Sequence, residues 1–221
     1  RHSAFVYTAF GSIISTVFGK HDSAYRLGQV SLKLNEKFDA VKYRCKTNFS
    51  FAYFILAWIR HVKETYRYFL DGYRYGIESG DHVFSGHCVN NLYFYKMFAG
   101  HNLDEAFEEY TRINSFIKGQ KDPFILSNCI DNERFYLNLK GKTDARASMS
   151  GSGYDEKVRE AEIISGGNLM EFFTFILMRM KIQYYYGNYS EAYALAEKNV
   201  ALLKVPIGSL YLPEYHFYQS L

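Results

Sequence analysis

The segment Gly141-Lys142-Thr143 has the ending of a phosphate-binding loop, so it is a first candidate for chemistry. The full motif needs a glycine five residues before Gly141, and this sequence has Tyr136 there. The motif also follows a strand, whereas the residues before Gly141 have a helical pattern. We therefore expect no nucleotide site and no cofactor in this chain.

A second group, His82, His87, Cys88 and His101, has side chains that can ligate zinc. Five residues separate His82 from His87, a spacing that splays the two side chains around a helix. Neither a Cys-x-x-Cys pair nor a His-Glu-x-x-His motif occurs in the sequence. We expect packing and capping roles for these residues, and no metal.

A catalytic nucleophile is also not indicated. Ser85-Gly86-His87 lacks the Gly-x-Ser-x-Gly surroundings of a nucleophile elbow. The acidic pairs Asp104-Glu105 and Glu108-Glu109 lie near an expected helix start, where carboxylates interact favourably with the helix dipole. We expect that this chain is not an enzyme and has no catalytic residue.

The charge balance limits the classes of partner. Lysine and arginine total 26 against 23 aspartate and glutamate, a net charge of +3. This is too little for the basic stripe of a nucleic-acid surface, and no polybasic segment offers a grip on a membrane. The cysteines, Cys45, Cys88 and Cys129, are odd in number and far apart, which favours a reducing, cytoplasmic location.

Two apolar runs, residues 4–18 and 49–59, are shorter than the roughly 20 residues that span a bilayer, so we expect buried helices there. Elsewhere, apolar residues at three- and four-residue spacing predict helices, and no sustained alternation indicates a strand. In residues 24–38 the apolar positions are Ala24, Leu27, Val30, Leu32, Leu34 and Phe38.

The breaks between the expected helices recur about every 40 residues, near Gly19, His61, Gly100, Gly141 and Gly187, a period typical of helical solenoids. The expected pairs are 2–18 with 22–37, 45–61 with 63–78, 82–99 with 103–118, 122–140 with 154–165, and 168–186 with 189–204, before a final helix from about 208. Residues 141–153, rich in Gly and Ser, predict a mobile loop inside the fourth pair. We expect one repeat domain over 1–221, cut from a longer chain.

The turns share a pattern in which a glycine ends one helix and an alanine follows in the next. Gly187 precedes Ala192, Gly19 precedes Ala24 with the same spacing, and Gly100 precedes Ala106 with one insertion. The glycine can adopt the left-handed cap conformation, and the small alanine lets the two helices approach closely. This pattern resembles the turn of tetratricopeptide repeats, which implies an all-α, TPR-like solenoid of antiparallel helix pairs, that is, an alpha-alpha superhelix.

A wider resemblance covers most of the chain. It rests on Leu27-Gly28, Gly76-Ile77-Glu78-Ser79-Gly80-Asp81, Ala99-Gly100, Leu103-Asp104-Glu105, Leu139-Lys140-Gly141, Gly187-Asn188-Tyr189-Ser190-Glu191-Ala192 and Glu214-Tyr215-His216-Phe217-Tyr218. These motifs resemble the helical-repeat region of bacterial multidomain signal-transduction ATPases. The resemblance implies a regulatory module between an ATPase and sensor or kinase domains, which would lie outside this sequence.

Tyrosine and phenylalanine are abundant, with 21 and 19 residues. We expect most of them in the core, and we take Tyr93, Tyr95, Tyr184 and Tyr185 as candidates for a binding face, because tyrosine tolerates partial exposure. The leading hypothesis is a signalling scaffold whose concave face binds a peptide or an adjacent domain of the same chain. A small-molecule-sensing domain and an RNA-binding repeat are the alternatives.

Overall fold

The computed structural model describes residues 3–117 and 123–221, and most of these residues are helical. No strand occurs in the described ranges, where an isolated bridge joins Gly151 to Tyr154. The helices pack in adjacent pairs, as in alpha-alpha superhelices, which confirms the predicted fold class. The chain forms two compact units, Arg1–Leu126 and Ser127–Leu221.

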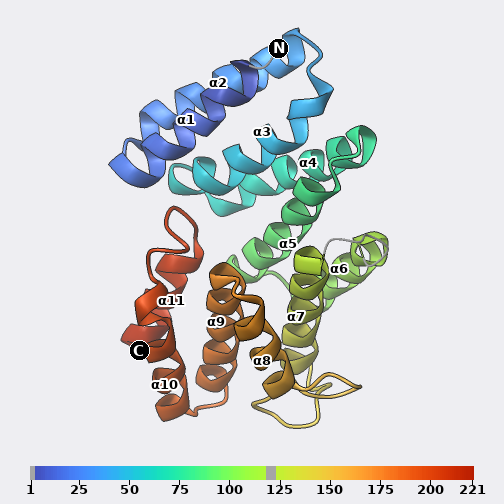
Figure 1. Ribbon diagram of the computed structural model, residues 1–221, viewed down its shortest axis with the longest axis vertical. Helices are drawn as coiled ribbons and strands as arrows, with labels where there is room; N and C mark the ends of the chain where they lie inside the picture. The colour runs from blue at the N-terminus through green and yellow to red at the C-terminus, as the bar shows by residue number, and fades with distance from the viewer. Residues whose placement is uncertain (1–2, 118–122) are drawn as a thin grey trace. The chain divides into compact units, whose positions relative to one another are not determined.

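The first unit contains three helix pairs, shown in blue to green in Figure 1. Helix α1 packs on α2, α3 on α4, and α5 on α6, while α1 and α2 also pack on α3 and α4 on α5. The helices are α1 (Ser3–Phe18), α2 (His21–Lys37), α3 (Val41–Phe54), α4 (Thr65–Ser79), α5 (His82–Phe98) and α6 (Leu103–Ile117).

The second unit contains most of α7, and α9 packs there on both α10 and α11. The helices are α7 (Pro123–Leu139), α8 (Glu156–Gly166), α9 (Leu169–Tyr185), α10 (Tyr189–Asn199) and α11 (Tyr211–Ser220) (Figure 1). The first helices of the five pairs begin at residues 3, 41, 82, 123 and 169, which confirms the period of about 40 residues.

One expected helix, 45–61, is interrupted. Helix α3 ends at Phe54 because the backbone of Ile55, with φ −123° and ψ −61°, leaves the helical region. Two short 3₁₀ helices, Leu56–Trp58 and Val62–Glu64, then lead into α4. The predicted break near His61 is therefore a longer connection that contains two 3₁₀ helices, and not a tight turn.

The predicted turn glycines all adopt the left-handed conformation, with φ of 62° at Gly19, 68° at Gly100 and Gly141, and 80° at Gly187. At Gly100 the helix end is closed by two hydrogen bonds, from Gly100 N to Met97 O and from the next amide to a carbonyl five residues back. The same pair of bonds closes α7 and α9, and this arrangement is the Schellman motif.

The alanines of the turn pattern, Ala24, Ala106 and Ala192, are buried, as close helix approach requires. Glycines extend the same principle along the helices. A Cβ atom on Gly28 would lie 2.3 Å from the Phe51 ring, so α2 and α3 can touch only because this position lacks a side chain.

Helices α1 and α2 leave exposed several apolar residues that the sequence pattern places in the core. On α1, the residues Val6, Phe10, Ile13 and Val17 form a stripe that is more than half exposed, so the helix is buried on one face only. Helix α2 buries a stripe of small and polar residues, Ala24, Gly28, Ser31 and Asn35, whereas Val30 and Phe38 are exposed. No helix in the described part of the chain is long and apolar enough to cross a membrane.

Residues 141–153, predicted to be a mobile loop, are attached to α7 by several hydrogen bonds. Asn138 Nδ2 donates to the carbonyl oxygens of Arg146 and Ser148, both at 2.8 Å, and Arg134 Nε donates to Met149 O at 2.8 Å. The Met149 side chain is fully buried. The segment therefore packs on α7, the helix that precedes it, and its backbone carbonyl groups accept hydrogen bonds from side chains of that helix.

Candidate functional site

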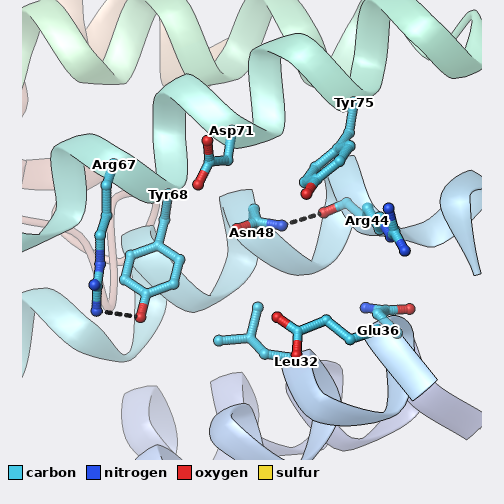
Figure 2. A pocket seen from close by; sticks show the side chains of 9 residues that line it. Leu32, Glu36, Arg44, Asn48, Arg67, Tyr68, Asp71 and Tyr75 are labelled. Atoms are coloured by element: carbon cyan, nitrogen blue, oxygen red, sulfur yellow. Dashed lines mark hydrogen bonds between the residues drawn. The ribbon is translucent and has the colours of Figure 1, made fainter. Parts of the chain in front are cut away.

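A polar cavity of about 260 Å³ lies in the first unit, between α2 of the first helix pair and α3 and α4 of the second. Figure 2 shows its side chains projecting from these three helices toward a shared space. The lining residues are Leu32, Asn35, Glu36, Arg44, Asn48, Arg67, Tyr68, Asp71 and Tyr75.

Helix α2 supplies Asn35 from its buried stripe, where polar residues replace the usual apolar ones. The Asn35 amide nitrogen donates to Thr47 Oγ1 at 2.8 Å. The amide oxygen, Oδ1, is shielded from solvent and has no hydrogen-bond partner. An acceptor in this state is unfavourable by about 1–3 kcal/mol, so it marks the cavity wall as incomplete.

Helix α3 supplies Arg44 and Asn48, which share a face because they are four residues apart. Asn48 Nδ2 donates to the Arg44 carbonyl oxygen at 2.8 Å (Figure 2). The Arg44 guanidinium donates to Asp39 at 2.9 Å and lies 5.1 Å from the centre of the Tyr75 ring. Arg44 Nε is buried and has no acceptor, so the site contains an unmatched donor as well as an unmatched acceptor.

Helix α4 supplies the opposite wall through Arg67, Tyr68, Asp71 and Tyr75, at spacings that place them along one side of the helix. Arg67 donates to Tyr68 Oη at 2.7 Å and lies 4.6 Å from the centre of that ring (Figure 2). Burial raises the pKa of Tyr68, and the charge of Arg67 partly opposes this rise. The Tyr68 hydroxyl therefore stays protonated near neutral pH.

The lining residues present donors and acceptors that can recognise a polar group. They include two carboxylates, two guanidinium groups, two amides and two phenols, and no serine, cysteine or histidine. In the part of the chain that the structure describes, no group of three His, Cys, Asp or Glu side chains is placed to hold a metal ion.

The residues with metal-binding side chains have other surroundings. His87 packs against the rings of Phe49 and Phe84, and Cys88 is fully buried. Burial raises the pKa of the Cys88 thiol, and a hydrogen bond with the Cys45 thiol adds to this rise. A protonated, buried thiol is a packing residue and a poor ligand.

The candidate aromatics from the sequence do not line the cavity. Tyr93 and Tyr95 are fully buried, because α3, α4 and α6 all pack on α5, so their interpretation as binding-face residues is corrected. Tyr184 and Tyr185 lie in the second unit, where Tyr185 is partly exposed and its hydroxyl is 2.6 Å from that of Tyr218. The turn residues described above position helices and do not reach the cavity.

The sequence analysis missed most of the cavity residues. The stretch Tyr66-Arg67-Tyr68-Phe69 stands out in the sequence as rich in aromatics, but Asn35, Arg44 and Asp71 carry no motif. One signal was present: Ser31 and Asn35 continue the three- and four-residue spacing of Ala24 and Gly28. A polar residue at a core-facing position of this kind indicates a buried polar site.

Nine side chains from three helices thus form a small polar cavity whose hydrogen-bonding capacity is not fully used within the chain. This is the chemistry of recognition, since donors and acceptors are present in fixed positions. Comparison with other proteins assigns no family to this chain: no family model matches it, and no curated protein matches it.

Proposed function

We propose that this chain is a non-catalytic helical-repeat module that binds a segment of another protein, or of an adjacent domain, in the cavity between α2, α3 and α4. The observation that carries the proposal is the unpartnered Oδ1 of Asn35 at the cavity wall. A peptide N–H group would supply its missing donor if binding turned the Asn35 amide toward the cavity, because Oδ1 is shielded from solvent in this conformation. A peptide carbonyl group would likewise accept from Arg44 Nε if the buried guanidinium moved toward the cavity.

The size of the cavity favours a side chain and its backbone over a large metabolite. Pockets that enclose drug-sized ligands measure about 300–1,000 Å³, and this cavity measures about 260 Å³. A small-molecule sensor remains the second candidate function, because the same unmatched groups would also hold a compact polar metabolite.

In a signal-transduction ATPase of the kind that the sequence resembles, we propose that such binding acts on helix stacking. Helix α2 belongs to the first pair, whereas α3 and α4 form the second. A segment held by both pairs would fix one arrangement of their interface, and this differential stabilisation is what a regulatory module requires.

The test is to select peptides that bind the protein from a random library and to measure their affinity by fluorescence anisotropy. Asn35→Ala should weaken binding at least tenfold. The matched control is Lys33→Ala, an exposed residue of the same helix that does not line the cavity. Thermal unfolding of both variants checks that they remain folded.

Recovery of no binding peptide, or equal affinity of wild type and Asn35→Ala for every recovered peptide, would contradict the proposal. A thermal-shift screen of metabolites addresses the second candidate function. Saturable stabilisation of the wild type by a metabolite, absent in Asn35→Ala and unaccompanied by peptide binding, would favour the small-molecule sensor.

A further inference from the structure

Helix α1 has two faces of opposite character, and its larger residues lie on the uncovered one. The face that packs on α2 and α3 is a stripe of small, buried residues: Ala4, Thr8, Gly11 and Ser15. The outer stripe of α1 consists of the residues that follow these by two positions, and each is more than half exposed: Val6, Phe10, Ile13 and Val17. Two residues correspond to about 200° around a helix, so the outer stripe lies opposite the packed face.

The equivalent face of α3 is covered by a helix. Helices α1 and α3 are the first helices of successive pairs, and they begin 38 residues apart, at residues 3 and 41. With this spacing, the outer stripe of α1 corresponds to four positions in and directly after α3: Arg44, Asn48, Phe51 and Ile55. The first two line the cavity together with residues of α2, and the last two form a buried cluster with Ala24 of α2. This face of α3 therefore meets the second helix of the pair before it.

The third pair repeats the relationship. Helix α5 begins at residue 82, which is 41 residues after the start of α3, so Ser85 corresponds to Arg44 of α3 and to Val6 of α1. Ser85 Oγ donates to the Tyr73 carbonyl oxygen of α4 at 3.2 Å. On α3 and α5 this face thus contacts a preceding second helix, whereas on α1 it is exposed in the described structure.

Helices α2 and α4 both use a glycine to cover such a face. A Cβ atom on Gly28 of α2 would clash with the Phe51 ring of α3, and one on Gly76 of α4 would lie 2.7 Å from the Cβ of Ser85. A residue without a side chain is what lets each second helix approach the next first helix closely. We infer that the outer stripe of α1 docks a helix pair of this same repeat type, whose second helix crosses the stripe with a glycine at the contact.

The composition of α1 favours a repeat helix over other occupants. The helix has no charged residue, so its exposed face is apolar throughout its length. In helical-repeat proteins the outer face of a capping repeat is polar, because it stays in water. The outer stripe has instead the character of a face between two repeats. A helix that lies on a membrane surface typically carries lysine and arginine, and α1 has neither.

The experiment adds the inferred occupant to the whole chain. A second copy of residues 3–40 is fused directly before the original α1, which reproduces the spacing between α2 and α3. The added copy carries Asn35→Ala, because Ala9 of the receiving helix occupies the position at which Thr47 accepts the Asn35 hydrogen bond. One reporter cysteine, Ile13→Cys, is placed on the original α1 in both the fused and the unfused chain.

The readout is the rate at which the reporter cysteine reacts with a maleimide. The native cysteines are buried, so they contribute little to this rate: Cys45, Cys88 and Cys129. We expect Ile13→Cys to react at least tenfold more slowly in the fused chain, because the added second helix covers it.

The matched control is Val30→Cys on the original α2, at a position that is exposed. Its counterpart on α4 is Arg74, since α2 and α4 begin 44 residues apart, at residues 21 and 65. The Arg74 side chain stays exposed in the presence of the first pair, so we expect Val30→Cys to react at the same rate in both chains. Equal slowing of both cysteines in the fused chain would overturn the assignment to the outer stripe.

Equal rates for Ile13→Cys in the two chains, which would also result if the added pair stayed unfolded, would overturn the inference. Two measurements on the unfused wild type test other occupants. A dimer in sedimentation velocity, dissociated by Phe10→Ser with Ile13→Ser, would assign the stripe to a second copy of this chain and overturn the repeat pair. Flotation with vesicles of phosphatidylcholine and phosphatidylglycerol, lost in the same variant, would overturn it in favour of a membrane. No residue of α1 lines the cavity, so each of these results leaves the proposed peptide binding standing.

Discussion

Arg159 in the second unit and Asn35 in the first are both polar side chains withdrawn from solvent, but their surroundings differ. The Arg159 guanidinium lies between Asp131 and Glu171, and it donates to Asp131 from Nε at 3.0 Å and from Nη2 at 2.9 Å. Tyr154 Oη donates to the same aspartate at 2.8 Å. The hydrogen bonds and charges of Asp131 and Glu171 outweigh burial and raise the pKa of Arg159.

Only one end of the Asn35 amide group has a hydrogen-bond partner in the described structure. Its nitrogen reaches Thr47, its oxygen reaches no partner, and the nearby Glu36 carboxylate is unpaired in the described structure. Buried polar groups that are satisfied within the chain make a core more specific, whereas incomplete ones reduce stability unless something else completes them. We therefore propose that the Arg159 network serves folding, whereas the Asn35 amide serves the binding proposed above.

The largest expected effect on stability comes from removing the Arg159 guanidinium. Arg159→Leu should lower the free energy of unfolding by about 3–5 kcal/mol, because Asp131 and Glu171 would be left buried without a counter-charge. Urea denaturation at neutral pH measures this loss.

The control is Arg74→Ala, which removes an exposed arginine with one long ion pair and should change stability by less than about 0.5 kcal/mol. A loss for Arg159→Leu as small as that of the control would show that the network is no more structural than a surface pair.

A second pair in the same unit shows that a buried ion pair does not by itself cancel the unfavourable effect of burial. Glu214 lies 2.5 Å from Lys181, and both side chains are almost fully buried. Burial raises the pKa of Glu214 above its usual value, and the Lys181 charge only partly opposes this. A carboxyl whose folded-state pKa is raised adds stability that is complete below the unfolded pKa of about 4.3. That stability is lost as the pH rises through the folded pKa.

The wild-type protein should therefore gain stability from this group as the pH falls from neutral toward the unfolded pKa, by up to about 1.4 kcal/mol per pH unit. Glu214→Gln should remove this part of the pH dependence, which urea denaturation at a series of pH values would measure. Glu191→Gln, an exposed change on α10, should leave the dependence as it is. Parallel pH profiles for the wild type and Glu214→Gln would contradict the assignment.

The parts of the structure that follow from local rules were predicted from the sequence, and those that depend on neighbours were not. Gly100 and Gly187 mark helix ends because the left-handed conformation is a property of one residue. Whether Tyr93 faces solvent or core depends on which helices cover α5, and periodicity within α5 carries no such information. Asn35 is similar, since its role appears only when Thr47 and the residues of α4 are brought beside it.

The smallest expected effect sharpens the comparison most. Replacing both members of the Asn35–Thr47 hydrogen bond by apolar residues of similar shape, Asn35→Leu with Thr47→Val, should leave stability within about 1 kcal/mol of the wild type or raise it. No buried polar atom of this pair would then lack a partner. The same double variant should lose the peptide affinity proposed above.

Thr47→Val alone is the contrasting variant, because it leaves the Asn35 amide nitrogen unpaired in addition to its oxygen, and it should be the less stable of the two. Urea denaturation and anisotropy on the same samples measure both properties. If the double variant were destabilised as strongly as Arg159→Leu, the Asn35 amide would be a structural group like the Arg159 network. The incompleteness of its hydrogen bonding would then no longer argue for a binding site.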